Sequence, residues 1–340
     1  MAYYGIENQP LAKRAWAVQE RILPSRTLHF SEWELFWECK TNSVCDSFPD
    51  GSPSPGRKGH YEKHVPASWE SIVMMYSSGS LTKSSDKLVA IAGIAQIYGP
   101  GEDYLAGMWR SGLEFMLRWV KWAGGSEKTL RQHRAPSWSW ASMNNEVFFF
   151  HDIQELQLNH RLCAKITDAW VDLLGESPFG EVRGGVLQLE CQLLAIRPME
   201  LTNPDGLFYD FAPYQSIPKS QIWTWGSLKW DYDDDYDEAN FSSSLYFVPI
   251  YEVTSSSSSN ISSTEGLMLR STGSKWGEYR RVGWFNISHY EPGIEPRDAW
   301  NWLETGISEF EASTRQLEPD DYIKAYKIGS GLRRCLIEVI

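Results

Sequence analysis

The chain has 340 residues, of which 42% are apolar and 22% charged, so it can form a folded core and about two domains. Its net charge is −12, which disfavours nucleic acid and anionic membrane surfaces as ligands, because phosphate groups are bound by basic surfaces. The N-terminal sequence lacks the basic and apolar regions of a signal peptide, and no apolar run is long enough to span a membrane. We therefore expect a cytoplasmic protein with no membrane span.

Tryptophan is unusually frequent, with 17 residues beside 16 Tyr and 14 Phe. Because Trp buries a large apolar area, we expect most of these rings to lie in an aromatic core. Exposed Trp side chains that stack on a ligand are the alternative. The five cysteines are odd in number and scattered, which indicates reduced thiols rather than a disulfide framework.

The first elements are a helix and a hairpin. Residues 10–23 are predicted to be helical, and Pro24 ends the helix. Residues 27–30 and 35–39 have the composition of two strands joined by a short turn, which predicts a β-hairpin. The apolar stripe of the helix consists of Leu11, Ala15, Val18 and Ile22.

A mostly helical segment is expected next. After a Pro/Gly/Ser-rich loop, helices are predicted at 68–77, at 86–98 with Ser85 as the N-cap, and at 103–122. The apolar residues of the third helix recur with a helical period, which predicts one buried face. This face consists of Leu105, Trp109, Leu113, Met116, Leu117 and Val120.

Beyond residue 130 the apolar period changes from 3.6 to 2, which indicates strands. After Pro136, the sequence SWSWAS predicts a strand with Trp138 and Trp140 on one face. A helix is expected near 297–312. Further strands are predicted at 186–194, 245–253, 266–270, 279–287 and 334–340.

These elements predict an α+β protein: a mostly helical N-terminal segment followed by a Trp-rich antiparallel β-domain that resembles a barrel or a sandwich. The expected boundaries are residues 1–45 for the helix and hairpin, 46–130 for the helical segment, and 131–340 for the β-rich domain with one inserted helix.

Several patterns resemble catalytic or metal sites but lack a required residue. His60 and His64 have the spacing of a zinc motif, but the glutamate between them is in the wrong place. The acidic run from Asp231 lacks the glycine and the final glutamate of a calcium loop. A nucleophile and base pair of Cys39 and His29 is conceivable, but a buried cysteine beside a hairpin is the simpler interpretation. We expect no metal and no cofactor.

The N-terminal helix carries polar side chains close to its apolar stripe. Gln19 falls inside the apolar arc and Glu20 lies at its edge. A buried amide without a hydrogen bond costs about 1–3 kcal/mol, so a partner is required. A polar network that holds the helix on the hairpin is the structural interpretation, and a contribution to a ligand or partner site is the functional one.

The pattern R-x-W-x-x-Q-E-R-x-L, S-R-x-L-H-F and L-x-W-E-C resembles the last motif of the heterokaryon incompatibility (HET) domain of filamentous fungi. Ala15 and Ala17 depart from the usual motif. Downstream sequences, including A-P-S-W-S-W-A-S, resemble the region that follows this domain. The motif residues are Arg14, Trp16, Gln19, Glu20, Arg21, Arg26, His29, Phe30, Trp37, Glu38 and Cys39, and the downstream motif contains Pro136, Trp138 and Trp140.

The resemblance implies a protein of non-self recognition and programmed cell death that acts through protein contacts. Earlier family motifs, which lie on an α/β core similar to TIR domains, have no counterpart before Arg14. It therefore implies a shortened form whose partner is another protein or that core, and whose residues do not by themselves constitute an enzyme. The alternatives are a carbohydrate- or ligand-binding module using Trp223, Trp225, Trp300 and Trp302, and an enzyme using Glu20, Glu38, His29 or Cys39.

Overall fold

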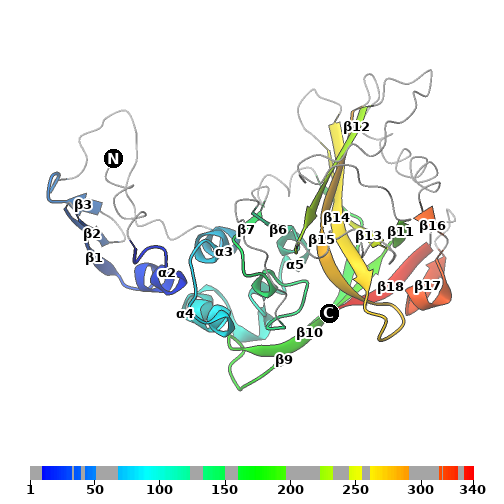
Figure 1. Cartoon of the computed structure of the whole chain (residues 1–340), viewed down its shortest axis with the longest axis horizontal. Coiled ribbons are helices and arrows are strands. Elements are labelled where there is room, and N and C mark those ends of the chain that lie inside the picture. Colours follow the sequence, from blue (N-terminus) through cyan, green and yellow to red (C-terminus); the bar gives the residue numbers. More distant parts are fainter. Residues whose placement is uncertain are drawn as a thin grey trace.

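The computed structural model describes residues 10–32, 34–39, 43–50, 68–122, 133–149, 160–196, 223–232, 245–254, 261–290, 314–315, 317–327 and 333–340. The elements follow one another along a long axis (Figure 1). The N-terminal helix and hairpin form one end, a large sheet forms the other, and short helices lie between them. The helix expected near 297–312, with Trp300 and Trp302, lies outside the described residues.

The N-terminal unit consists of helix α2 (Ala15–Ile22) and strands β1 (Arg26–Phe30), β2 (Leu35–Cys39) and β3 (Ser43–Cys45). The three strands form a small antiparallel sheet. The predicted helix and hairpin are confirmed, although the helix is shorter than 10–23. Its buried residues are Ala15 and Val18, whereas Leu11 remains 55% exposed.

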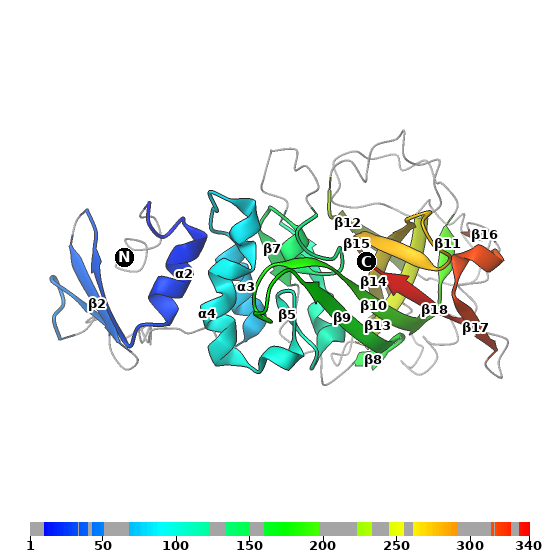
Figure 2. The same cartoon turned by 90° about the horizontal axis from the view of Figure 1, so that it is seen from below.

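Helix α2 packs on α4 (Val89–Tyr98), and α3 (Trp69–Ser77) lies beside them (Figure 2). The contact is close because Gly79 and Gly93 have no side chain at this position. A Cβ on Gly79 would lie 2.7 Å from Ala15 Cα, and one on Gly93 would lie 2.8 Å from Gln19 Oε1. Both predicted helices are present, but Ser85 is not the N-cap of α4. A 3₁₀ turn, η1 (Ser84–Lys87), precedes that helix instead.

The helix predicted at 103–122 is wrong, and with it the mostly helical character of the N-terminal segment. The chain here forms η2 (Gly101–Asp103), β4 (Tyr104–Leu105), β5 (Met108–Trp109), α5 (Leu113–Met116) and β6 (Trp119–Lys121), which pairs with β7 (Val147–Phe149). Ala106, Gly107 and Gly112 have positive φ angles of 49°, 93° and 75°, which end any helix.

The six residues of the predicted apolar face are nevertheless all buried. Tertiary contacts replace the helical ones: the rings of Trp69, Tyr98, Tyr104 and Trp109 meet at centroid distances of 5.1–6.2 Å. The apolar pattern thus identified core residues correctly, although it assigned them to the wrong element.

Among the described residues, eleven strands form one sheet, mainly antiparallel as predicted. The main order is β16-β11-β13-β14-β15-β18-β10-β9, with β12 beside β15, β17 beside β18 and β8 beside β13. The strands are β8 (His160–Leu162), β9 (Lys165–Leu173), β10 (Val182–Cys191), β11 (Leu194–Ile196), β12 (Trp223–Trp230), β13 (Leu245–Thr254), β14 (Ile261–Ser271), β15 (Glu278–Tyr290), β16 (Thr314–Arg315), β17 (Lys324–Lys327) and β18 (Arg333–Val339).

A closed barrel is not formed by the described strands. Strand β9, at one end of the order, contacts β4, and Nη2 of Arg110, the residue after β5, donates a hydrogen bond to the carbonyl of Ala169 at 2.7 Å. The outer edge of β9, which would have to pair with another strand to close a barrel, is therefore in contact with residues 104–110 instead. A short 3₁₀ turn, η6 (Pro319–Asp321), precedes β17.

Strand β15 changes its neighbour along its length. At its start Tyr279 pairs in parallel with Val339 of β18, and from Gly283 onward it pairs with β12, beginning at Trp230. Between these two pairings, the edge of β15 at Arg280–Val282 faces neither strand. The segment that fills this gap begins at Pro136.

Candidate functional site

The N-terminal unit contains a buried polar cluster. Antiparallel pairing puts His29 opposite Phe36 and Thr27 opposite Glu38, so these side chains share the face toward α2. Glu38 is only 2% exposed. Its Oε1 accepts a hydrogen bond of 3.0 Å from Nη2 of Arg21, and its Oε2 lies 2.9 Å from Nε2 of His29. The carboxylate of Glu38 in β2 is thus bound by Arg21 of α2 and by His29 of the neighbouring strand β1.

The charge of Glu38 is set by these neighbours. Burial alone would raise the pKa of Glu38, but the hydrogen bond from His29 and the positive charge of Arg21 lower it to about 2. The carboxylate therefore remains ionised at neutral pH in spite of its burial. Such a group is a structural anchor, because a general acid would need a pKa nearer to 7.

Gln19 has the partner that its position required. Its side-chain Oε1 accepts a hydrogen bond of 3.2 Å from the backbone N–H of Gly93 in α4. The amide therefore ties α2 to α4 and does not face open solvent. Glu20, by contrast, is exposed.

The opposite face of the small sheet is apolar and partly exposed. Leu28 pairs with Trp37, Phe30 pairs with Leu35, and Trp37 also pairs with Val44, so these five side chains share one face, here called the outer face. Leu28 is 50% exposed and Phe30 is 76% exposed, and the other three are half-buried. Contiguous exposed apolar side chains of this kind mark interaction sites.

The remaining motif residues lie apart from the polar cluster. Arg14 is exposed and forms a β-bridge with Ser80, and Trp16 packs partly buried on the main core. Arg26 is exposed at the edge of the outer face, opposite Cys39. Arg21, His29 and Glu38 of the motif therefore form one buried cluster, whereas Arg14, Trp16 and Arg26 each lie in a different environment.

The register separates the residues of the enzyme hypothesis. Cys39 pairs with Arg26, three positions from His29, so the thiol and the imidazole lie on opposite faces of the hairpin. With Glu20 exposed elsewhere, only Glu38 and His29 of the four residues come together. Cys39, the nucleophile of that hypothesis, is therefore not beside this pair.

The downstream motif forms a turn and a 3₁₀ helix, η3 (Trp140–Ser142), and not the predicted strand. Trp138 and Trp140 are fully buried. Two of its polar groups reach the turn between β4 and β5: Trp140 Nε1 donates to the carbonyl of Gly107 at 2.6 Å, and Ser139 Oγ donates to that of Ala106 at 2.5 Å. These contacts outside the motif override the alternating pattern that predicted a strand.

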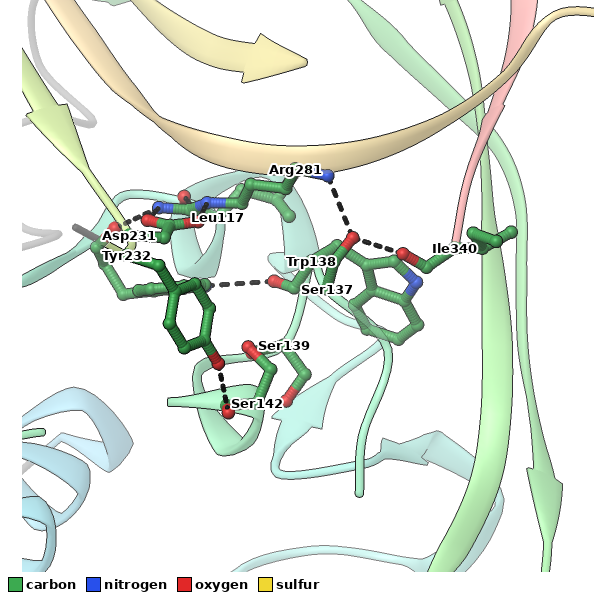
Figure 3. Close-up of polar contacts among 10 residues, drawn as sticks. Leu117, Ser137, Trp138, Ser139, Ser142, Asp231, Tyr232, Arg281 and Ile340 are labelled. Carbon is green, nitrogen blue, oxygen red and sulfur yellow. Dashed lines mark hydrogen bonds and ion pairs between the residues drawn. The ribbon is translucent and has the colours of Figure 1, made fainter. Parts of the chain in front are cut away.

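An ion pair that sequence reasoning missed lies beside this motif (Figure 3). Arg281 of β15 is fully buried, its Nε donates to Asp231 at 3.1 Å, and its other nitrogens donate to the carbonyls of Leu117 and Trp119. Its guanidinium carbon lies 3.4 Å from the centroid of the Trp119 ring. The position of Arg281 in the apolar strand Y-R-R-V-G-W-F was the available signal.

A second buried pair runs in the opposite direction. Arg118, which lies between Leu117 and Trp119, donates two hydrogen bonds to Oε2 of Glu265 in β14, at 3.0 and 2.6 Å. Arg281 of the sheet therefore binds the backbone of Leu117 and Trp119. Arg118, which lies between these two residues, binds Glu265 of the sheet.

A pocket of about 500 Å³ lies next to the motif. It is lined by His133, Ala135, Pro136, Ser137, Ser142, Arg183, Gly184, Gly185, Asp231, Tyr232, Ser271, Thr272, Arg280, Arg281 and Ile340. The pocket therefore lies where β15 passes from β18 to β12.

The other patterns considered in the sequence lie mostly outside the described residues. No group of His, Cys, Asp or Glu in the described ranges could hold a metal ion, and His60 and His64 lie outside them. The side chains of Trp223 and Trp225 also lie outside, whereas the exposed Trp122, Trp170 and Trp276 belong to separate elements. Within the described part of the chain, no helix is long and apolar enough to cross a membrane.

Comparison with protein-family models, with curated proteins and with solved structures gave no match to this chain.

Proposed function

We propose that this protein acts in a heterokaryon-incompatibility type of non-self recognition and cell-death signalling, through contacts of its N-terminal unit with a protein partner. The observation that supports the proposal is the outer face. An apolar surface that includes a Phe side chain 76% exposed is held in place by a buried carboxylate on the other side of the same hairpin. Such a surface is suited to burial against a partner.

The partner that fits is the α/β core of a HET-domain protein. The motif residues of the N-terminal unit resemble the final motif of that domain. The chemistry of the face adds a requirement: Arg26 borders it, is exposed, and has no carboxylate partner in the described ranges. The partner surface should therefore be apolar with an acidic residue at its rim.

The test uses the α/β segment of a fungal HET-domain protein, produced separately, and titrates it into this protein by calorimetry. We expect saturable binding that Phe30→Asp and Leu28→Asp each weaken at least tenfold, which corresponds to about 1.4 kcal/mol. Trp276→Asp is the matched control, because this ring is 69% exposed at the other end of the molecule. Binding that is absent, or that Trp276→Asp weakens equally, refutes the proposal.

A further inference from the structure

Two cysteines face each other across the strands β10 and β18. Cys191 is the last residue of β10, and the antiparallel register puts it directly opposite Cys335. Neither residue is in a disulfide, and both are 0% exposed. Directly opposite residues of an antiparallel pair have their side chains on the same face of the sheet, so the two thiols are neighbours within the core.

The hydrogen bonds of β18 determine the spacing of this pair. Strand β17 pairs with the same residues of β18 as β10 does, so it lies on the opposite edge of β18. The carbonyl of Leu336 points to that opposite edge, because it accepts the N–H of Ile323, the residue before β17, at 2.9 Å. Backbone groups of successive residues alternate between the two edges, so those of Cys335 point toward Cys191. In such a hydrogen-bonded pair the two Cα atoms are about 5.5 Å apart.

This spacing suits a disulfide bond between the two side chains. The Cα atoms of disulfide-bonded cysteines are usually about 4.4–6.8 Å apart, most often about 5.5–6 Å. The Cβ atoms of directly opposite residues are about 4.5–5.5 Å apart, compared with about 3.5–4.5 Å in a disulfide. The bond therefore requires the two strands to approach each other by only about 1 Å, without a change of register.

The other three cysteines are not placed opposite a thiol. Cys39 pairs with Arg26 and Cys45 pairs with Phe36, so these two cysteines lie on opposite faces of the small sheet. Cys163 directly follows β8, and its N–H donates to the carbonyl of Ile250 at 2.9 Å. All five cysteines of the chain lie in the described ranges, and Cys191 and Cys335 are the two that the strand register brings together.

We propose that Cys191 and Cys335 are a redox-sensitive modification site, which forms a reversible disulfide between β10 and β18 when the protein meets a peroxide. The thiolate of one cysteine attacks a peroxide oxygen and breaks the O–O bond, which gives a sulfenic acid and, with a proton, one molecule of water. The sulfur of the second cysteine then attacks the sulfenic sulfur, and the S–O bond breaks as a second molecule of water leaves. The two thiols are thereby oxidised to one S–S bond, and hydrogen peroxide is reduced to two molecules of water.

Burial controls when this pair reacts. Burial raises the pKa of the Cys191 thiol, so the thiolate that attacks a peroxide is scarce while the sheet is closed. The pair lies at the end of the β10–β18 ladder, where local opening requires the least free energy. Once formed, the disulfide fixes β18 on the sheet, and Ile340, the residue after β18, accepts the N–H of Ser137 at 3.1 Å (Figure 3). The site therefore reacts when this end of the sheet opens, and the bond prevents further opening.

The test adds hydrogen peroxide to the folded full chain, blocks the remaining thiols with iodoacetamide in urea, and maps the peptides by mass spectrometry without reduction. We expect a linked pair of peptides that contains Cys191 and Cys335, about 2 Da lighter than the two thiol peptides together, and dithiothreitol should separate it. The oxidised protein should also unfold at a temperature about 5 °C higher, because a disulfide restricts the unfolded chain. Cys335→Ala should abolish both effects, whereas Cys163→Ser, the matched control, should behave as the unaltered protein does.

Recovery of Cys191 and Cys335 as blocked thiols after peroxide treatment overturns the proposal, and so does a link of either residue to one of the other three cysteines. An unchanged unfolding temperature of the linked protein contradicts the fixing of β18. Peptide mapping of the unaltered protein is decisive even if Cys335→Ala does not fold, which circular dichroism establishes. The result is independent of the proposed function, since neither cysteine belongs to the N-terminal unit.

Discussion

Glu38 offers a direct test of the N-terminal unit. Its pKa falls from the usual 4.5 to about 2 on folding, a difference that corresponds to about 3 kcal/mol at about 1.4 kcal/mol for each tenfold change. Because the pKa of Glu38 is lowered in the folded state, this contribution is present above pH 4.5 and is lost as the pH falls toward 2. The stability of the unit should therefore decrease within this window.

The perturbation is Glu38→Gln, which keeps the shape of the side chain and removes its charge. The variant removes the charge of Glu38 from Arg21 and retains at most one hydrogen bond with His29. We expect the unit to lose about 2–3 kcal/mol at pH 7, and the pH dependence between 4.5 and 2 to become nearly flat.

Amide hydrogen exchange of β1, followed from pH 7 to pH 2.5, is the measurement, because it reports the local opening of the hairpin. Glu20→Gln is the matched control, since this carboxylate lies one residue from Arg21 and is exposed. Equal exchange in Glu38→Gln and the unaltered protein, or an unchanged pH dependence, would refute the role assigned to this carboxylate.

Three further predictions concern packing. Arg281→Met should lower the free energy of unfolding in urea by about 3–5 kcal/mol, because it removes the arginine from a buried ion pair and from two backbone carbonyls. Gly93→Ala should lower it by no more than about 1 kcal/mol, because the added Cβ would meet only the end of the flexible Gln19 side chain, which can turn away with the loss of its hydrogen bond to Gly93; Gln19→Ala should then have little further effect in this background. Phe30→Asp should change the midpoint of thermal unfolding by no more than about 2 °C, whereas Phe36→Asp, which places a charge at a 4% exposed position, should unfold the N-terminal unit. A large effect of Phe30→Asp would mean that the outer face is covered.

Sequence periodicity was most informative where local pairing determines the structure. The alternation of Leu187, Leu189 and Cys191 with Gln188 and Glu190 predicted the strand and its buried side correctly, because β10 has one face in the core. The hairpin was predicted for the same reason: its two strands are adjacent in sequence, and their register follows from a short turn.

Periodicity failed where backbone conformation and distant partners decide. Residues 103–122 have a helical apolar pattern, yet Gly107 and Gly112 adopt positive φ angles that a helix does not contain. The tight approach of Gly107 to the ring of Trp140, at 2.8 Å from a Cβ position, depends on a residue 33 positions away. A single sequence contains no signal for such a contact.

The candidate site was predicted in composition but not in geometry. The motif contained Arg21, His29 and Glu38, and the structure joins these three. The prediction that Gln19 holds the helix on the hairpin is wrong, because its partner is the N–H of Gly93 in α4, 74 positions away. The pocket was not predicted, because its lining comes from six separate segments of the chain.

The polar cluster also explains how an apolar face can persist on the outside of the small sheet. A hairpin with two apolar faces could pack on α2 with either face, and a slip of one residue would exchange them. With Glu38 and His29 on one face, such a slip would move both away from Arg21 and break the ion pair and the hydrogen bond of the Glu38 carboxylate. The cluster therefore selects the orientation in which Leu28 and Phe30 point outward. The proposed contact with a partner requires this arrangement, since the hairpin would otherwise bury these two side chains against its own helix.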